Sequence, residues 1–391
     1  MQRRHGFTLV ELLVAMALTL FIMVIITSAF VTGLDTFRGL KGIGDMQEGL
    51  RTAAQRLRDD LRANHFEGDR KMSDPSMLHS TLLEPGTVRK PEQGFFRVSE
   101  KFPLVSPIFE GQDVDGGPVS YRATDNYLHF TVNLRGSREE KFYLGTLPPK
   151  VGGINHLTDY ATTLRFPSDP SLEDARYQDP KLRVYSSQWA EVAYFLVPSK
   201  DELNQPRKAG NTPLYNLYRL QRLVIPSDDK VEQQNSTLIS GALWEQYGEI
   251  SCQRFPSVDV DGDGIGELNF QTPTELNNLP VDRSFYKNDE YGASLLLNNV
   301  VSFLIQIPEK INTGTGEIIF DRIKENPYPE LEGEPELGVN EGLRPRAIDS
   351  AYFDGTTTGQ NLPSIFGLRI TIRVWDEKTK QTRQITIYQD I

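Results

Sequence analysis

The sequence predicts an α+β protein in which a long N-terminal helix, transmembrane then amphipathic, packs on an antiparallel β-sheet head with long loop insertions. An uncharged apolar run extends from Leu12 to Leu34. After Asn64, several segments alternate apolar and polar residues with the period of two typical of half-buried strands. The expected segments are residues 1–6, a leader; 7–34, a transmembrane half-helix; 35–64, an amphipathic half-helix; and 65–391, a β-rich globular head.

The apolar run has the length of a single membrane span. A span needs about 20 apolar residues to cross a hydrocarbon core of about 30 Å, and Leu12 to Leu34 is long enough to cross with some tilt. The basic pair Arg3-Arg4 precedes the run, and basic residues favour the cytoplasmic side. We therefore expect a single-pass chain with a cytoplasmic N-terminus and a head on the opposite side.

One acidic residue, Glu11, stands at the start of the apolar run. A carboxylate inside a bilayer costs about 2.5–3.5 kcal/mol or more, and a buried acid needs a counter-charge. We therefore expect Glu11 to have a cationic partner. The alternative is a plain single-pass anchor in which Glu11 lies at the headgroup boundary.

The segment from Gly6 to Met16 (Gly-Phe-Thr-Leu-Val-Glu-Leu-Leu-Val-Ala-Met) resembles the processing motif of the type IV prepilin family. An ordinary secretory signal is cleaved after its apolar stretch, whereas here the junction Gly6-Phe7 lies before it. The resemblance implies that a prepilin peptidase cuts after Gly6 and methylates the new amino terminus of Phe7. It also implies that Glu11, the fifth residue of the mature chain, pairs with a terminal amine during filament assembly.

The helix is predicted to continue to about Ala63. Its apolar residues recur at helical spacing and form one stripe, which we interpret as ordinary packing against a sheet. The residues of the stripe are Met46, Leu50, Ala54, Leu57 and Leu61.

Several glycines lie between the span and the stripe. Glycine inside a helix costs up to about 1 kcal/mol relative to alanine, so the cluster can act as a hinge where the helix leaves the bilayer. Small-residue packing against a neighbouring subunit is an equal alternative. The glycines are Gly33, Gly39, Gly42, Gly44 and Gly49.

The head is predicted to contain strands joined by long loops. The candidate strands are Tyr127–Leu134, Glu191–Val197, Leu214–Leu220, Leu295–Ile307 and Leu368–Val374, the last forming a hairpin with Ile385–Tyr388. The candidate loops are Glu67–Gln93, Arg135–Leu182, Ser199–Pro213 and Pro308–Arg346. The order of these strands, together with Gln47–Arg51 and Leu57–Arg62, is similar to J-type pseudopilins and W-type minor pilins, although this chain is longer.

An acidic loop carries a candidate calcium site. Alternate acids and intervening glycines follow one another from Asp259 to Glu267, and calcium takes six to eight oxygen ligands from carboxylates and carbonyls. The segment resembles short Asp-rich calcium loops of extracellular repeat proteins. The twelfth position of a full EF-hand loop would be Phe270, and the alternative is a solvated acidic turn. The expected ligands are Asp259, Asp261, Asp263, the Ile265 carbonyl and Glu267.

Composition limits the remaining classes of function. The single cysteine, Cys252, permits no intrachain disulfide, and the net charge of −11 argues against broad binding to nucleic acid or anionic lipid. The sequence contains no zinc-protease helix, P-loop, Rossmann glycine pattern or nucleophile elbow. We therefore expect a protein that is not an enzyme and has no specific nucleic-acid partner.

The resemblance implies a minor pilin or pseudopilin, a structural subunit at or near the tip of a type II secretion pseudopilus or a type IV pilus. It would be stored in the inner membrane with its head periplasmic or extracellular. Its partners would be the prepilin peptidase, inner-membrane lipid, other minor subunits and the major subunit. Two alternatives remain: a surface adhesin or DNA-uptake tip subunit whose loops bind a ligand, and a membrane-tethered enzyme.

Overall fold

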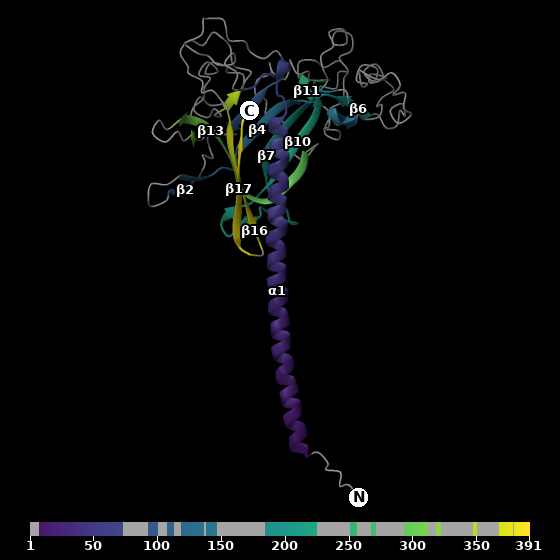
Figure 1. The fold of residues 1–391 in the computed structure, drawn as a ribbon, viewed down its shortest axis with the longest axis vertical. Coiled ribbons are helices and arrows are strands. Elements are labelled where there is room, and N and C mark those ends of the chain that lie inside the picture. Colours follow the sequence, from purple (N-terminus) through teal and green to yellow (C-terminus); the bar gives the residue numbers. More distant parts are fainter. Residues whose placement is uncertain are drawn as a thin grey trace.

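A computed structural model describes the long helix and the sheet framework of the head. In Figure 1 the helix α1 extends far below the head, and its upper end lies against the sheet. The described residues are 8–72, 93–100, 108–112, 119–136, 138–146, 184–224, 251–255, 267–270, 293–311, 318–321, 347–349, 367–377 and 379–391.

The helix α1 runs from Leu9 to Arg62, and most strands belong to one large sheet. The strands of the large sheet are β1 (Phe96–Glu100), β4 (Asn126–Asn133), β7 (Trp189–Pro198), β10 (Tyr215–Val224), β13 (Ala293–Ile311), β14 (Ile318–Asp321), β15 (Ala347–Asp349), β16 (Leu368–Asp376) and β17 (Gln381–Gln389). The smaller elements are β2 (Ile108–Gln112), β3 (Val119–Arg122), β5 (Tyr143–Thr146), β6 (Val184–Ser187), β8 (Lys208–Ala209), β9 (Thr212–Pro213), β11 (Cys252–Phe255), β12 (Glu267–Phe270), and the 3-10 turns η1 (Glu67–Asp69) and η4 (Glu139–Lys141).

The large sheet is antiparallel at every pairing that the structure describes. Its strand order is β15-β1-β4-β7-β10-β13-β16-β17, with β14 paired to β13. The small strands pair as β2-β3, β5-β6, β8-β9 and β11-β12. One long N-terminal helix on an antiparallel β head confirms the predicted fold class. Each predicted strand is present, and the predicted C-terminal hairpin is β16-β17.

Three of the predicted loops contain strands: β5 lies within Arg135–Leu182, β8 and β9 lie within Ser199–Pro213, and β14 lies within Pro308–Arg346. At the start of the last of these predicted loops, β13 continues to Ile311 and pairs with β14. The register shifts between Pro308 and Lys310. Proline lacks a backbone donor and is tolerated in strands mainly at edges and irregularities, which explains how the strand passes through this residue.

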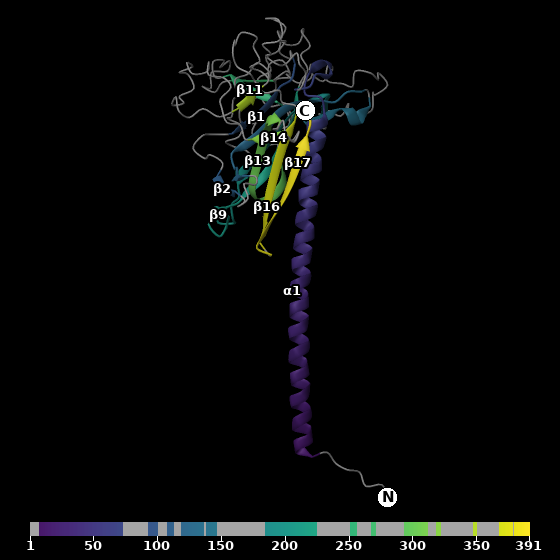
Figure 2. The same cartoon turned by 60° about the vertical axis from the view of Figure 1, so that its left-hand side comes forward.

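The upper part of α1 packs on one face of the sheet. Leu50, Ala54, Leu57 and Leu61 are buried there, and Met46 packs at the margin, as the helical stripe predicted. The strand β16 alternates buried and half-buried residues and turns Leu368, Ile370, Ile372 and Val374 into the same core. Figure 2 shows α1 passing β16 and β17 before it continues below the head.

Gly49 lies on α1 beside β13. A Cβ at this position would lie 3.4 Å from Leu297 Cδ2 on β13, which is an ordinary van der Waals contact. By contrast, a Cβ at Gly33, Gly39 or Gly44 would meet no atom of the described chain within 4 Å. Those three glycines therefore do not serve packing within one molecule, and both interpretations given above still apply to them.

Candidate functional site

The N-terminus of α1 is closed by a reciprocal cap between Thr8 and Glu11. The Glu11 backbone N–H donates to Thr8 Oγ1 (3.3 Å), and Glu11 Oε2 accepts from the Thr8 backbone N–H (2.8 Å) and hydroxyl (2.9 Å). Such a capping box satisfies two backbone donors that a helix start would otherwise leave unpaired. It also turns the Glu11 carboxylate back toward the start of the chain. Gly6 and Phe7 lie outside the described residues.

The part of α1 from Leu9 to Gly49 precedes the buried face of the helix, and we call it the stem; Met46 and Gly49, near its upper end, contact the head. It is long and apolar enough to cross a membrane, and its most apolar window has no buried residue. Large apolar side chains are exposed along it, for example Leu9 (82%), Phe21 (64%) and Phe37 (66%). A continuous apolar surface of this size marks a membrane or protein interface. The stem is therefore consistent with a membrane-anchored protein.

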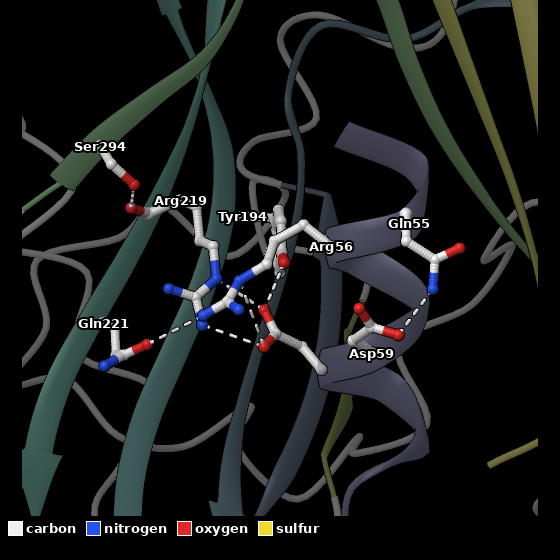
Figure 3. A network of polar contacts seen from close by, with 8 residues as sticks. Gln55, Arg56, Asp59, Tyr194, Arg219, Gln221 and Ser294 are labelled. Atoms are coloured by element: carbon white, nitrogen blue, oxygen red, sulfur yellow. Dashed lines mark hydrogen bonds and ion pairs between the residues drawn. The ribbon is translucent and has the colours of Figure 1, made fainter. Parts of the chain in front are cut away.

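The upper end of α1 is joined to the sheet by a buried ionic group, which we call the joint cluster (Figure 3). Asp60, on the sheet-facing side of α1, is 5% exposed. Its carboxylate accepts from Arg219 Nε (2.6 Å) and Nη2 (2.9 Å) on β10, and from the Tyr194 hydroxyl on β7. Arg56 Nε lies 3.9 Å from the same carboxylate, and Arg56 Nη2 donates to Gln221 Oε1 (3.4 Å).

The electrostatics of the joint cluster favour its ionised form. Burial opposes the charge on Arg219, but its hydrogen bonds to Asp60 outweigh that effect and raise the pKa of the guanidinium. Burial and then the Asp60 charge raise the pKa of Tyr194, so the phenol keeps its proton and donates. A bidentate arginine–carboxylate pair fixes both partners in one geometry. The cluster therefore holds the helix at one place on the sheet.

Sequence reasoning did not single out Asp60. It lies three residues after Leu57, within the stripe, but beside Asp59, whose carboxylate accepts only a local bond from Gln55 Nε2 (2.7 Å). The available signal was the position of Asp60 on the apolar face, together with a basic residue inside the strand Tyr215–Val224. The pairing itself spans 159 residues of sequence and follows only from the tertiary fold.

A second buried polar group, the outer cluster, lies on residues of β4 and β7 that alternate with the core-facing ones. His129 Nε2 lies 2.6 Å from Glu191 Oε1, and the Ser251 hydroxyl donates to Glu191 Oε2 (2.6 Å). All three side chains are buried. Burial raises the pKa of Glu191, but the bond from His129, its charge, Arg222 and the Ser251 hydroxyl together lower it to about 2.

The predicted calcium ligands Asp259, Asp261, Asp263 and Ile265 lie outside the described residues, and Glu267 is the first residue of β12. Within the described ranges, no three His, Cys, Asp or Glu residues gather in a group that could hold a metal ion. The calcium site stays a prediction.

Comparison with known proteins identifies the N-terminal segment. Residues 1–27 match the family model described as the prokaryotic N-terminal methylation motif. No curated protein and no solved structure matches the chain. The matched segment contains the Gly6-Phe7 junction, the capping box and the first part of the exposed stem. The motif does not distinguish the J type from the W type. The motif supports a type IV prepilin-like protein, and the apolar stem and the antiparallel head agree with it.

Proposed function

We propose that this protein is a minor pilin or pseudopilin that is stored in the inner membrane and assembled at or near the tip of a type II secretion pseudopilus or a type IV pilus. The methylation motif in front of an exposed apolar stem carries this proposal. Proteins with this motif are processed by a prepilin peptidase, assemble with other pilins and are generally structural. The head, which the joint cluster fixes to α1, would then move as one body with the stem.

Glu11 is proposed to act in assembly. The capping box turns its carboxylate back to Thr8, the first described residue. Processing would create the amine of Phe7 four residues before Glu11 in the sequence, and the amine of a neighbouring subunit could reach the same carboxylate. Either amine offsets the cost of keeping an ionised acid in an apolar environment. The Glu11 carboxylate of the stem is therefore best stabilised when a cationic partner is present.

Processing is tested by mass spectrometry of protein extracted from membranes. The N-terminal peptide should begin at Phe7 and carry one methyl group on its amine. A Gly6→Ala variant should retain the leader, and the same chain in cells lacking the peptidase provides the control. An intact Met1 terminus in cells with active peptidase would contradict the proposal.

Assembly is tested with Glu11→Ala. This variant should insert and fold normally but enter sheared filaments several-fold less than the wild type, because the lost carboxylate no longer pairs with an amine. Glu11→Gln, which keeps the size and the bond from Thr8 but not the charge, should fail similarly. Equal incorporation of all three proteins, measured by immunoblot of the filament fraction, would remove the ion-pair role.

One group of buried residues, the outer cluster, bears on the alternative that the protein is an enzyme. His129, Glu191 and Ser251 combine residue types used in hydrolases, but Glu191 lies between the other two and accepts a hydrogen bond from the Ser251 hydroxyl. In a hydrolytic triad the serine instead donates to the histidine, and the histidine donates to the carboxylate. Because all three side chains are also buried, the arrangement favours a structural role.

A further inference from the structure

Two connections of the head lie together at the end from which the stem leaves, and we call them the lower edge. One is the turn between β16 and β17, residues 376–381, and the other is the connection between β7 and β10, residues 199–214. Arg207 Nη2 in the second connection lies 2.9 Å from Glu377 Oε2 in the first. Figures 1 and 2 show this end of the head turned toward the N-terminal end of α1.

The lower edge lies close to the level at which the apolar run of the stem ends. Trp375 and Asp376, at the end of β16, line one groove with Gly42 of the stem, and Gly42 follows Leu34, the last residue of the run, by eight residues. At a rise of about 1.5 Å per residue, this separation is about 12 Å. The turn then continues below Asp376 (Figure 1). Because the headgroup layer adds about 5–8 Å to each side of the hydrocarbon core, an inserted stem brings the lower edge to the headgroups.

Resting on the proposed function, which places the stem in the inner membrane, we propose that the lower edge binds the phospholipid headgroups of that same membrane. The stored subunit is then held at two places, by the stem inside the bilayer and by the lower edge on its surface. Entry into a filament must release the second contact.

Two apolar side chains of the lower edge suit the boundary between water and lipid. Leu203 is 79% exposed, and Asp201 Oδ1 fixes its loop by accepting from the backbone N–H groups of Leu203 (2.9 Å) and Gln205 (2.8 Å). A leucine on such a fixed loop can enter the headgroup boundary without ordering its backbone anew. Trp375 is half-buried beside the stem, and tryptophan is enriched at membrane–water interfaces.

The basic side chains of the lower edge are available to lipid phosphates. The acids Asp376 and Glu377 are engaged within the edge, since Asp376 Oδ2 accepts from the Thr379 hydroxyl (2.6 Å) and Glu377 pairs with Arg207. Basic residues outnumber acids there by five to four, whereas the whole chain has a net charge of −11. A membrane acts on charges only within a Debye length of about 8–10 Å, so the local charge decides. Three lysines are exposed and have no ion-pair partner among the residues that the structure describes: Lys200, Lys208 and Lys380.

The experiment compares the heights of two points above the membrane, using full-length chains that carry Cys252→Ser and one new, fluorescently labelled cysteine. Gln205→Cys reports the lower edge. Thr52→Cys is the matched control, because Thr52 is exposed on α1 ten residues above Gly42. The chains are reconstituted in vesicles of phosphatidylethanolamine and phosphatidylglycerol that contain a lipid with a nitroxide quencher on its headgroup. We expect strong quenching of the label at residue 205 and little quenching of the label at residue 52.

Charge reversal tests the lysines. The triple variant Lys200→Glu, Lys208→Glu and Lys380→Glu should lose the quenching at residue 205, because each lysine near an anionic surface favours the bound state about five-fold. Molar salt, which shortens the Debye length to about 3 Å, should weaken the quenching of the wild type. A matched triple variant reverses three exposed basic residues elsewhere on the head and should keep the quenching: Lys71→Glu, Arg138→Glu and Lys141→Glu.

A third label, at Phe21→Cys, separates this proposal from the proposed function. Quenchers on lipid acyl chains reach residue 21 only when the stem is inserted. Quenching there without quenching at residue 205 would overturn the lower-edge contact and leave the proposed function intact. Equal quenching at residues 205 and 52, or equal losses in the two triple variants, would overturn the contact as well. A label at residue 21 that stays in water would overturn the membrane storage on which both proposals rest.

Discussion

Two buried carboxylates, Asp60 and Glu191, lie on opposite faces of the large sheet and are neutralised in different ways. Asp60 is held by a bidentate arginine and a tyrosine at the joint with α1. Glu191 is held by a histidine and a serine in the outer cluster. Arginine keeps its charge at every pH that a protein survives, whereas the outer cluster depends on the ionisation of Glu191, whose pKa is lowered to about 2.

The difference indicates a division of roles. In the joint cluster, the Arg219 guanidinium keeps its proton as the pH rises. The attachment of α1 to the head therefore stays constant as the pH varies around neutrality. The outer cluster ties residues of β4 and β7 to Ser251 through a bond that depends on ionisation. Comparing variants of the two clusters should therefore separate a permanent attachment from a pH-dependent one.

The largest effect is expected for Asp60→Ala, which leaves Arg219 buried without its counter-charge. Removing one partner of a buried pair costs about 3–5 kcal/mol. Urea unfolding of the full chain in detergent, followed by tryptophan fluorescence, measures the loss. Asp59→Ala is the matched control and should stay within about 0.5 kcal/mol of the wild type. Equal stability of the two variants would show that the joint cluster does not anchor the helix.

A smaller effect is expected for Glu191→Gln, and it should depend on pH. The pKa of Glu191 is lowered in the folded state, so its ionised form stabilises the protein above the unfolded value of about 4.5. That stability is lost as the pH falls from about 4.5 toward about 2. The contribution at neutral pH is on the order of 3 kcal/mol. Glu191→Gln should therefore flatten the unfolding free energy across this range. Profiles of wild type and variant that run parallel would contradict the assignment.

The smallest of the three effects is expected for Tyr194→Phe. The change removes one hydrogen bond to the Asp60 carboxylate but leaves the Arg219 pair in place, which should cost about 1.5 kcal/mol. Tyr388→Phe is the control, because Tyr388 is 61% exposed on β17. Unfolding free energies of both variants at pH 7 make the comparison. A loss as large as that of Asp60→Ala would mean that the tyrosine, and not the arginine, dominates the cluster.

The sequence predicted the elements better than their contacts. The stripe from Leu50 to Leu61 and the alternation of Leu368–Val374 identify their elements because local periodicity reflects a single buried face. The short strand β1 (Phe96–Glu100) was not predicted; it lies between β15 and β4, far apart in sequence. The extension of β13 past Pro308 was missed because only its pairing with β14 reveals it.

The candidate sites show the same limit. Glu11 could be singled out because a lone acid at the start of an apolar run is costly in lipid. Asp60 could not be given a partner from the sequence, because Arg219 and Tyr194 come from strands on other parts of the chain. Charged residues in an amphipathic helix usually lie in solvent, and only the packed structure shows which one does not.

Because the stem is long, a small rotation of α1 at the joint cluster produces a large displacement of the far end of the helix. From Leu50, where burial begins, the helix extends to Leu9, a distance of about 60 Å at 1.5 Å per residue. A rotation of about 5° at the head would displace the far end by about 5 Å over that length. A substitution deep in the head can therefore move Glu11 relative to the amine that we propose as its partner, without touching the stem. The packing of the head interior therefore helps to determine where the N-terminal end of the helix lies.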